Sequence, residues 1–514
     1  MRLEKIMKNG VIGLVTQVIV LVMGFLTQIV FTHYLGQTNY GLNSVISNLL
    51  NMLSLAELGV GSAITYHLYK PIAEGDQNTI ASIMALFRRV YWTIGFVVFG
   101  LGCLLMLLIP VFITESGVDI AFVRLIFFIQ LMSTVSTYFL SYKRTLLYAD
   151  QKNYVCALYD TLMNIIFSVL RIVFLVLYQD YIVYSVLMVL QQIAANLLIS
   201  YYCNKQYPQL KDRHIKPYDK AKNLFVDTKN ILVGKVAVYI YSSTDNLVIS
   251  TFSSITGGLF TVGGLNYYVY ITNAIRTIVN SVLYSMAPAI GNFLQSGRDR
   301  KEMYPLFNHY TFVRHFIATV SATGLIVCST PLVYMCYGGE QAVMPQIVVL
   351  LISLDVFISI TSGPINELIS VLGLFHYEKY LNAVGAAMNL ISSIIFVQFI
   401  GVPGVLLGTV ISQLFFWISK CILVFRKYFK EGMMEYWRKV SAYIAVDIVQ
   451  VIGLLWLCGR LFPTPSVGGF IGAAALCVAV PFVLVVIVFH RSKEFQFAYQ
   501  LTLGVLSKLR RVKK

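Results

Sequence analysis

The sequence contains little charge for its length. Only 12% of its 514 residues are Asp, Glu, Lys or Arg, whereas 58% are hydrophobic and the mean hydropathy is +0.74. A soluble protein of this size needs many more polar side chains to cover its surface. The composition therefore excludes an ordinary soluble protein, and no polar segment is long enough to form a separate soluble domain.

Residues that usually carry chemistry are also scarce. The 8 cysteines and 7 histidines are scattered, with no close pair of cysteines and no carboxylate at ligand spacing from a histidine. The sequence has no GxxxxGK[ST] phosphate loop. We therefore expect no metal site, no cofactor and no enzymatic activity such as nucleotide hydrolysis.

Long apolar runs recur from Val11 to Phe489. Each is long enough to cross a hydrocarbon core of roughly 30 Å as a helix, and none shows the alternating pattern of a membrane barrel. The sequence therefore predicts an all-α, polytopic membrane protein with about fourteen transmembrane helices. The expected spans are 11–32, 42–66, 90–113, 120–145, 155–178, 181–203, 229–255, 263–290, 310–337, 343–371, 380–400, 402–425, 439–460 and 466–489.

Basic residues predict the orientation of these spans. Most of the 39 lysines and arginines fall in alternate loops, and short loops rich in them stay cytoplasmic. Both termini are therefore expected in the cytoplasm, and the first span, which lacks a small-residue cleavage site, is expected to be retained. The net charge of +16 follows from this bias, so we expect contact with membrane lipid rather than nucleic acid.

The longest polar interruption divides the chain into two lobes. We expect an N-terminal lobe of six helices at 1–208, a cytoplasmic linker at 209–228 and a C-terminal lobe of six helices at 229–426. Residues 427–514 would add helices thirteen and fourteen and a basic cytoplasmic tail, in which spaced aromatic and leucine residues suggest a short interfacial helix.

The two lobes open with similar sequences. Each has a glycine-rich stretch near the expected outer face, YLGQTNYG at 34–41 and TGGLFTVGG at 256–264, followed by a helix with one polar side. Because each lobe has an even number of crossings, both enter the membrane in the same direction. A pseudo-two-fold repeat about an axis along the membrane normal would relate them.

Polar side chains recur at helical spacing within several spans, which places them on one face of each helix. They are expensive in lipid, so they indicate either a polar pathway or hydrogen bonds between helices. The second, fifth, seventh, eighth and tenth spans carry such stripes. The amides expected to line a pathway are Asn48, Asn51, Asn164, Asn246, Asn273 and Asn280.

Charged residues inside the spans need a partner or a water-filled cavity. The cations deep in their spans are Arg171, Lys235 and Arg276. They suggest a cationic cavity between the lobes for an anionic substrate, because Arg and Lys stay charged and Arg forks two hydrogen bonds to phosphate oxygens. The acidic residues available for ion coupling or as counter-charges are Glu57, Asp245, Asp355 and Glu367.

Buried structural ion pairs are the alternative interpretation of these charges. Arg124, Arg314 and Lys420, nearer the ends of their spans, are interpreted as side chains that reach towards the membrane surface. Gly363 and Pro364, in the sequence SGPINE, are expected to interrupt the tenth span, because proline cannot donate a backbone hydrogen bond.

Three stretches resemble a known family. YLGQTNYGLNSVISNLLNMLSLAELGVGSAITYHLYKPIAEGD at 34–76, STDNLVISTF at 243–252 with the following NYYVYITNAIRTIVNSV, and LGLFHYEKYLNAVGAAMNLISSIIFVQFIGVPGVLLGTVIS at 372–412 carry the resemblance. They are similar to bacterial polysaccharide repeat-unit flippases, the lipid-linked oligosaccharide branch of the multidrug/oligosaccharidyl-lipid/polysaccharide exporter superfamily.

This resemblance implies translocation of undecaprenyl-diphosphate-linked oligosaccharides from the inner to the outer leaflet of the bacterial cytoplasmic membrane by alternating access. The product would be a cell-surface polysaccharide such as capsule or O-antigen. The three deep cations would attract the diphosphate and the amides would bond sugar hydroxyls. A polysaccharide polymerase and a chain-length regulator are the implied protein partners.

Three other functions fit part of the pattern. A cation-coupled multidrug antiporter of a sister branch would have twelve helices and a surplus of buried carboxylates. A polytopic polysaccharide polymerase or ligase would be an enzyme with a large outer loop, whereas the outer loops expected here are short. A scaffold of an envelope assembly would need no polar stripes.

Overall fold

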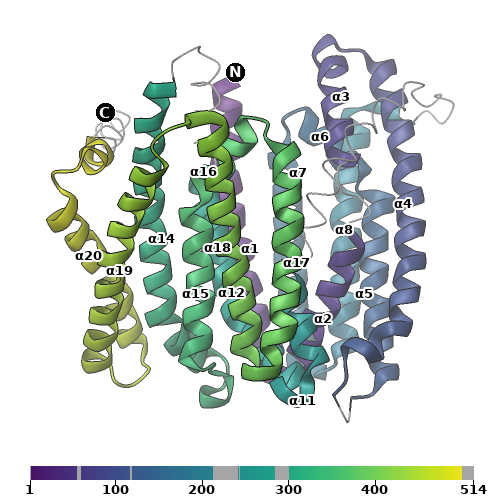
Figure 1. The fold of residues 1–514 in the computed structure, drawn as a ribbon. Coiled ribbons are helices and arrows are strands. Elements are labelled where there is room, and N and C mark those ends of the chain that lie inside the picture. Colours follow the sequence, from purple (N-terminus) through teal and green to yellow (C-terminus); the bar gives the residue numbers. More distant parts are fainter. Residues whose placement is uncertain are drawn as a thin grey trace. The chain divides into compact units, whose positions relative to one another are not determined.

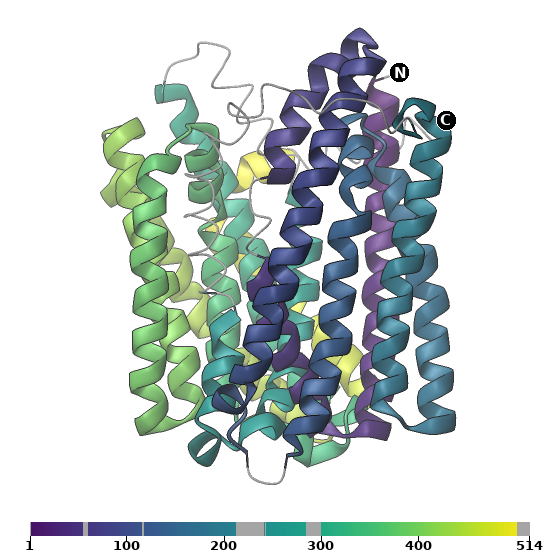
Figure 2. The same ribbon diagram turned by 90° about the vertical axis from the view of Figure 1, so that its right-hand side faces the viewer.

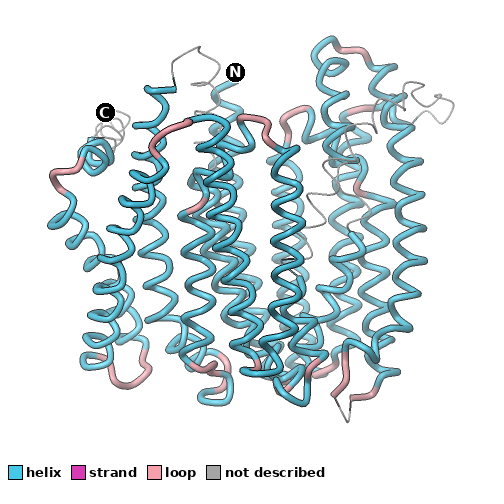
Figure 3. Tube along the Cα trace, in the orientation of Figure 1, coloured by secondary structure: helices cyan, strands magenta, loops and turns pink. Residues whose placement is uncertain are grey.

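The computed structural model describes residues 2–54, 60–115, 118–211, 241, 243–283 and 300–500. Every regular element in these ranges is a helix, joined by loops at the helix ends (Figure 3). In a membrane, a helix satisfies all its backbone hydrogen bonds within one segment. The predicted all-α class is confirmed.

Eleven helices in the described ranges are long and apolar enough to cross a membrane. They overlap eleven of the expected spans, although the helices Gln77–Phe112 and Glu302–Cys336 begin well before the expected residues 90 and 310. The chain is therefore a multi-pass membrane protein. The other three expected spans are 42–66, 229–255 and 263–290, and each includes residues outside the described ranges. The count of fourteen therefore stays a prediction.

The helices gather into two compact units, Met1–Asn266 and Tyr267–Lys514, here called the first and second units. In the first unit α1 packs on α7, and α5 lies between α4 and α8, as Figure 2 shows from the side. Its helices are α1 (Arg2–Leu35), α2 (Gln37–Leu53), α3 (Val60–Glu74), α4 (Gln77–Phe112), α5 (Ile120–Leu140), α6 (Tyr142–Ala149), α7 (Asn153–Tyr178), α8 (Tyr181–Gln206), a helix described at 243–251, α11 (Ser253–Thr256) and the start of α12 (Gly258–Leu283).

In the second unit α17 packs along α18, and α14 contacts α15, α19 and α20 (Figure 1). Its helices are the rest of α12, α14 (Arg300–Cys336), α15 (Gln346–Thr361), α16 (Gly363–Val371), α17 (Phe375–Ile400), α18 (Val402–Val424), α19 (Met433–Leu461) and α20 (Val467–Phe489). The division into lobes at 209–228 stays a proposal, because residues 212–240 lie outside the described ranges.

Polar caps mark where several helices begin. The side chains of Asp76, Asp119 and Asp180 accept hydrogen bonds from the first backbone N–H groups of α4, α5 and α8, and Ser466 does the same for α20. These donors have no partner within the helix, so a capping oxygen stabilises the helix end. The caps explain why the apolar runs start as helices at these residues.

The predicted interruption at Gly363 and Pro364 is confirmed. Helix α15 ends at Thr361 and α16 begins at Gly363, with Ser362 between them. Proline has no N–H to continue the helical ladder and sits here at the start of the new helix, where that loss costs least.

The chain beyond α20 turns back onto the second unit. Residues 493–500, here called the C-terminal segment, form a helix that docks through a Glu494–Lys439 ion pair of 2.9 Å and a stack of Phe497 on His309 at 4.4 Å. Burial alone would raise the pKa of Glu494, but the hydrogen bond and charge of Lys439 outweigh it and hold this pKa below its usual value. The rest of the predicted interfacial helix, at 501–514, lies outside the described residues.

Candidate functional site

Helix α2 turns its polar face outward. Leu42, Val45, Ile46 and other apolar side chains are buried, whereas Asn48 is half-buried and Asn51 is exposed. A helix whose outer face met lipid would show the opposite distribution. The outer face of α2 therefore needs water or another polar surface beside it.

Helix α12 shows the same arrangement in its second half. Asn273 and Asn280 are exposed, and Arg276, one turn from each, is partly buried. Exposed amides on a helix of membrane-spanning length are costly against hydrocarbon. The sequence prediction that these residues share one face is thus consistent with a polar space beside α12.

Arg276 is held by an acidic residue of α15. Its Nη2 lies 2.5 Å from Oδ2 of Asp355, and the two side chains are 30% and 17% exposed. Its Nε is buried without a hydrogen-bond partner. Asp355 thus serves as a counter-charge, while the guanidinium stays partly accessible and under-satisfied.

Arg171, by contrast, is committed to contacts inside the first unit. It is 8% exposed, and its Nη2 donates to Gln191 Oε1 at 2.9 Å and to Ser168 Oγ at 3.1 Å. The guanidinium also lies over the ring of Tyr184, at 5.4 Å from the centroid. These contacts join α7 to α8, so the structure favours the hydrogen-bonding interpretation for this cation.

The other polar residues of α7 are placed in two ways. Asp160 receives two hydrogen bonds from Arg144 of α6, at 2.6 and 2.7 Å, and so belongs to a structural pair. Asn164 is half-buried, and its Oδ1 has no hydrogen-bond partner in the described residues. The side-chain oxygen of Asn164 can therefore accept a further hydrogen bond.

Asn246 forms an amide pair with Asn266 of α12. Each side-chain nitrogen faces the other's oxygen, at 3.1 and 3.4 Å. Asp245, beside it in the chain, is half-buried. Lys235 and Glu57, the remaining predicted charges, lie outside the described residues.

Glu367 pairs with Arg314, which the sequence interpretation had directed to the membrane surface. That interpretation was wrong: Arg314 is only 5% exposed and contacts Glu367 Oε1 and the hydroxyl of Tyr310. The guanidinium lies directly on Gly363, where any Cβ would overlap it. The break between α15 and α16 is therefore packed under an arginine from α14.

Lys420 is likewise buried in a polar cluster rather than directed to the surface. Its Nζ lies 2.8 Å from Glu378 Oε1 on α17 and 3.1 Å from Asn366 Oδ1 on α16. The two charged side chains are only 12% and 19% exposed. Helical spacing within one span could not reveal this cluster, because its members come from three helices.

The helices α2 and α12 meet through two glycines at the expected outer end. A Cβ on Gly41 would lie 1.9 Å from the carbonyl oxygen of Leu259, and one on Gly263 would lie 2.2 Å from that of Gln37. Gln37 lies one helical turn before Gly41, and Leu259 lies one turn before Gly263. Each helix therefore supplies both a glycine and the carbonyl that faces the other helix's glycine. The contact is therefore reciprocal, as a local two-fold axis requires.

The loop between α4 and α5 supports this crossing. Glu115 Oε2 accepts a hydrogen bond from the backbone N–H of Leu259 at 2.9 Å, close to the start of α12, where helix dipoles favour an anion. Thr114 contacts the backbone of Thr251 at 3.0 Å and the hydroxyl of Ser253 at 2.8 Å. This end of the first unit is closed by backbone contacts and short polar side chains.

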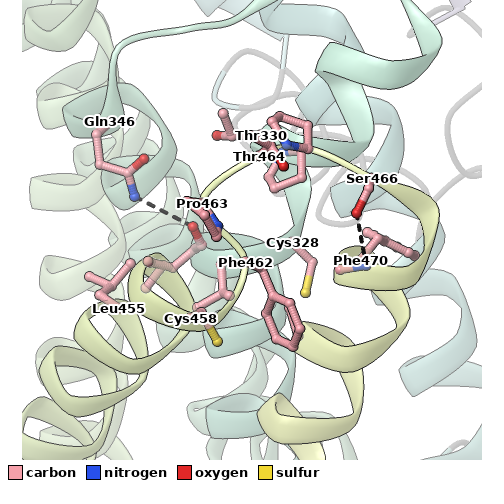
Figure 4. A pocket seen from close by; sticks show the side chains of 17 residues that line it. Cys328, Thr330, Gln346, Leu455, Cys458, Phe462, Pro463, Thr464, Ser466 and Phe470 are labelled. Carbon is pink, nitrogen blue, oxygen red and sulfur yellow. Dashed lines mark hydrogen bonds between the residues drawn. The ribbon is translucent and has the colours of Figure 1, made fainter.

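A separate cavity of about 280 Å³ lies in the second unit, beside the loop between α19 and α20 (Figure 4). Cys328, Cys458, Phe462 and Phe470 face it, and none of the residues that line it is charged. It contains none of the predicted site residues. The cavity has a mostly apolar lining, with Thr330, Gln346, Thr464 and Ser466 as its polar members, and does not belong to the polar faces of α2 and α12.

A multi-pass helical protein with outward polar faces and paired intramembrane charges has the character of a membrane transporter. The model of a family described as polysaccharide biosynthesis protein matches residues 6–294, which is more than half of the chain. The chain belongs to this family. No curated protein matches it by sequence.

Solved transporters share its fold. A lipid II flippase, MurJ, in an inward-closed conformation is 15% identical, with 93% of this chain and 98% of that one covered and a TM-score of 0.64. An inward-facing multidrug resistance MATE family transporter of the MOP superfamily is 13% identical, with coverages of 85% and 99% and a TM-score of 0.62. A MOP superfamily transporter from Pyrococcus furiosus is 12% identical, with coverages of 80% and 94% and a TM-score of 0.55.

Proposed function

We propose that this protein is a flippase that moves undecaprenyl-diphosphate-linked oligosaccharide repeat units from the inner to the outer leaflet of the bacterial cytoplasmic membrane. The observation that carries the proposal is the outward polar face of α12, where Asn273 and Asn280 flank the partly exposed Arg276. Amides suit sugar hydroxyls and a guanidinium suits a diphosphate. The family and the fold support a transporter of polysaccharide biosynthesis.

The diphosphate would replace Asp355 as the partner of Arg276. The side chains of Arg276 and Asp355 are 30% and 17% exposed, so a phosphate oxygen can reach the guanidinium without unfolding the helix pair. Before substrate binds, the carboxylate of Asp355 neutralises Arg276, so that no unpaired cation lies in the membrane. Binding then exchanges one anion for another.

Alternating access requires that an end of the pathway close and open. The crossing of α2 and α12 at Gly41 and Gly263 supplies a closed end, because backbone meets backbone with no side chain between. Such a contact separates as a whole rather than residue by residue. We place it on the outer side, with both termini in the cytoplasm.

The multidrug antiporter receives less support from the charges. An organic cation needs an acidic residue that is available to it. In the described part of the second unit, the carboxylates of Asp355, Glu367, Glu378 and Asp447 each lie against a cationic or histidine side chain. Among these paired groups, Arg276 is more exposed than any of the four carboxylates, which favours an anionic substrate.

The test is flipping of a fluorescent undecaprenyl-diphosphate oligosaccharide in proteoliposomes that contain the purified full chain. We expect protein-dependent flipping that Arg276→Gln reduces by at least about tenfold, the cost of losing one charge-assisted contact of about 1.5 to 3 kcal/mol. Arg460→Gln, at an exposed arginine near the end of α19, is the matched control and should retain activity.

Two results would contradict the proposal. The first is full flipping by Arg276→Gln in protein that folds normally, which would remove the assigned role of this residue. The second is no flipping of several such lipids by folded wild-type protein, together with efflux of a cationic dye under a proton or sodium gradient. That outcome would establish the antiporter instead.

A further inference from the structure

A buried histidine–aspartate pair joins α14 to α19 in the second unit. His315 Nε2 lies 2.8 Å from Asp447 Oδ2, and Thr319 donates to the other carboxylate oxygen, Oδ1, at 3.0 Å. His315 is 5% exposed, and the side chain of Asp447 is 16% exposed. Both residues lie near the middle of helices long enough to cross the membrane.

The pair differs in chemistry from the other intramembrane pairs of the second unit. In those pairs a carboxylate lies against Arg276, Arg314 or Lys420, side chains of a type that is ordinarily cationic at physiological pH. Histidine is the side chain whose charge changes near neutral pH. Among these described pairs, His315–Asp447 is the one able to gain or lose a proton without stranding a permanent cation.

The pair is also under-satisfied. Although Nε2 and Oδ2 are close, neither imidazole nitrogen nor Oδ2 makes a well-aligned hydrogen bond within the described residues. A buried polar group without such a bond destabilises the folded state and requires an explanation. A site that binds and releases a proton explains it, because one fixed set of hydrogen bonds cannot serve both protonation states.

The pair lies among aromatic rings, and the nearby charges are themselves paired. The rings of Phe357 on α15 and Tyr443 on α19 lie 5.3 and 5.1 Å from the imidazole. Within about two helical turns along α14 and α19, the other titratable residues are His309, Tyr310, Arg314, Lys439 and Tyr443. The helices packed against α14 add Asp355 on α15, Glu367 on α16 and Cys477 on α20. Arg314 and Glu367 neutralise each other, as do Arg276 and Asp355.

We propose that His315 and Asp447 form a proton-binding site within the membrane, which couples protonation to the packing of α19 against α14. With one proton, neutral imidazole lies beside the carboxylate. A second proton on Nδ1 creates an imidazolium with an N–H in an aromatic surrounding that offers no acceptor among the described residues. The imidazolium is attracted to the carboxylate, whereas the added donor has to find water or a new partner, so proton uptake changes this contact between the helices.

The test is the pH dependence of thermal unfolding of the purified full chain between about pH 5 and 8, the range in which imidazoles titrate. We expect His315→Gln and Asp447→Asn each to remove at least about half of the wild-type shift in Tm. The double variant should remove no more than either single variant, because both act on one site. His376→Gln, at an exposed histidine of the same unit, should keep the wild-type profile.

Hydrogen exchange of the wild-type chain provides a second test that needs no variant to fold. After correction for intrinsic rates, protection at 310–320 and 442–450 should change by at least about threefold between about pH 5 and pH 8. Protection in α17 and α18 should change little. Uniform exchange across the second unit, or single-variant effects that simply add, would overturn the proposal. Neither experiment uses a lipid-linked substrate, so failure here leaves the proposed flippase function standing.

Discussion

Substitution of either crossing glycine should open the contact between α2 and α12. In Gly41→Ala the new methyl group would start 1.9 Å from the carbonyl oxygen of Leu259, and in Gly263→Ala 2.2 Å from that of Gln37. Ordinary contact between such atoms needs about 3.5 Å, so the backbones must separate by roughly 1.5 Å. Overpacking of this kind costs about 1 to 3 kcal/mol.

The reciprocal geometry makes a sharper prediction for the double variant. Separation of the two helices relieves both overlaps at once, because each glycine faces the other helix at the same crossing. The free-energy cost of Gly41→Ala/Gly263→Ala should therefore be well below the sum of the two single costs. Two independent packing sites would give simple additivity.

Hydrogen exchange is the appropriate assay, because it reports local opening directly. At about 1.4 kcal/mol for each factor of ten, peptides covering 37–45 and 259–266 should exchange about 5- to 150-fold faster in each single variant. Gly13→Ala in α1 is the matched control, since no atom lies within 4 Å of its added Cβ. Unchanged exchange in both crossing variants would refute the assignment of this contact as a closed end.

Three further changes test the charges and the helix break. Asp355→Asn should lower the Tm but tighten binding of a diphosphate lipid by several-fold, measured by titration, because the substrate no longer competes with a carboxylate. Gly363→Ala should destabilise the protein by about 1 to 3 kcal/mol in thermal unfolding, because its Cβ would overlap the guanidinium of Arg314, whereas Gly324→Ala, with open space around it, should not. Because the folded-state pKa of Glu494 is lowered, the stability that this residue contributes is present above its unfolded-state pKa and is lost as the pH falls through the folded-state pKa. The C-terminal segment should therefore become protease-sensitive in acid, and also at neutral pH in Glu494→Gln.

The sequence predicted those features that depend on one segment at a time. Apolar length predicted the spans, and the proline at 364 predicted where α15 gives way to α16. Helical spacing placed Asn273, Arg276 and Asn280 on one face, and the structure leaves all three at least partly exposed. Each of these properties is decided by local backbone chemistry or by the helical period.

Features that depend on contact between helices were not predictable in this way. Arg314 looked like a residue that reaches the membrane surface, yet it is buried against Glu367 because α16 restarts at a glycine beneath it. Arg171 looked like a cation of the cavity, yet its guanidinium donates a hydrogen bond to Gln191 of the next helix. A spacing rule within one span carries no information about which residue of another helix lies opposite.

The helices that look least like membrane spans carry the polar faces. Neither α2 nor α12 is among the eleven described helices that are long and apolar enough to cross a membrane. Helix α2 has only 17 residues, and in α12 asparagine, tyrosine and glycine residues lower the mean hydropathy. The strongly apolar helices surround the charges that need pairing, whereas α12 keeps Arg276 partly open beside its amides. In the proposed flippase, these less apolar helices are the ones that we expect to contact the sugar and the diphosphate.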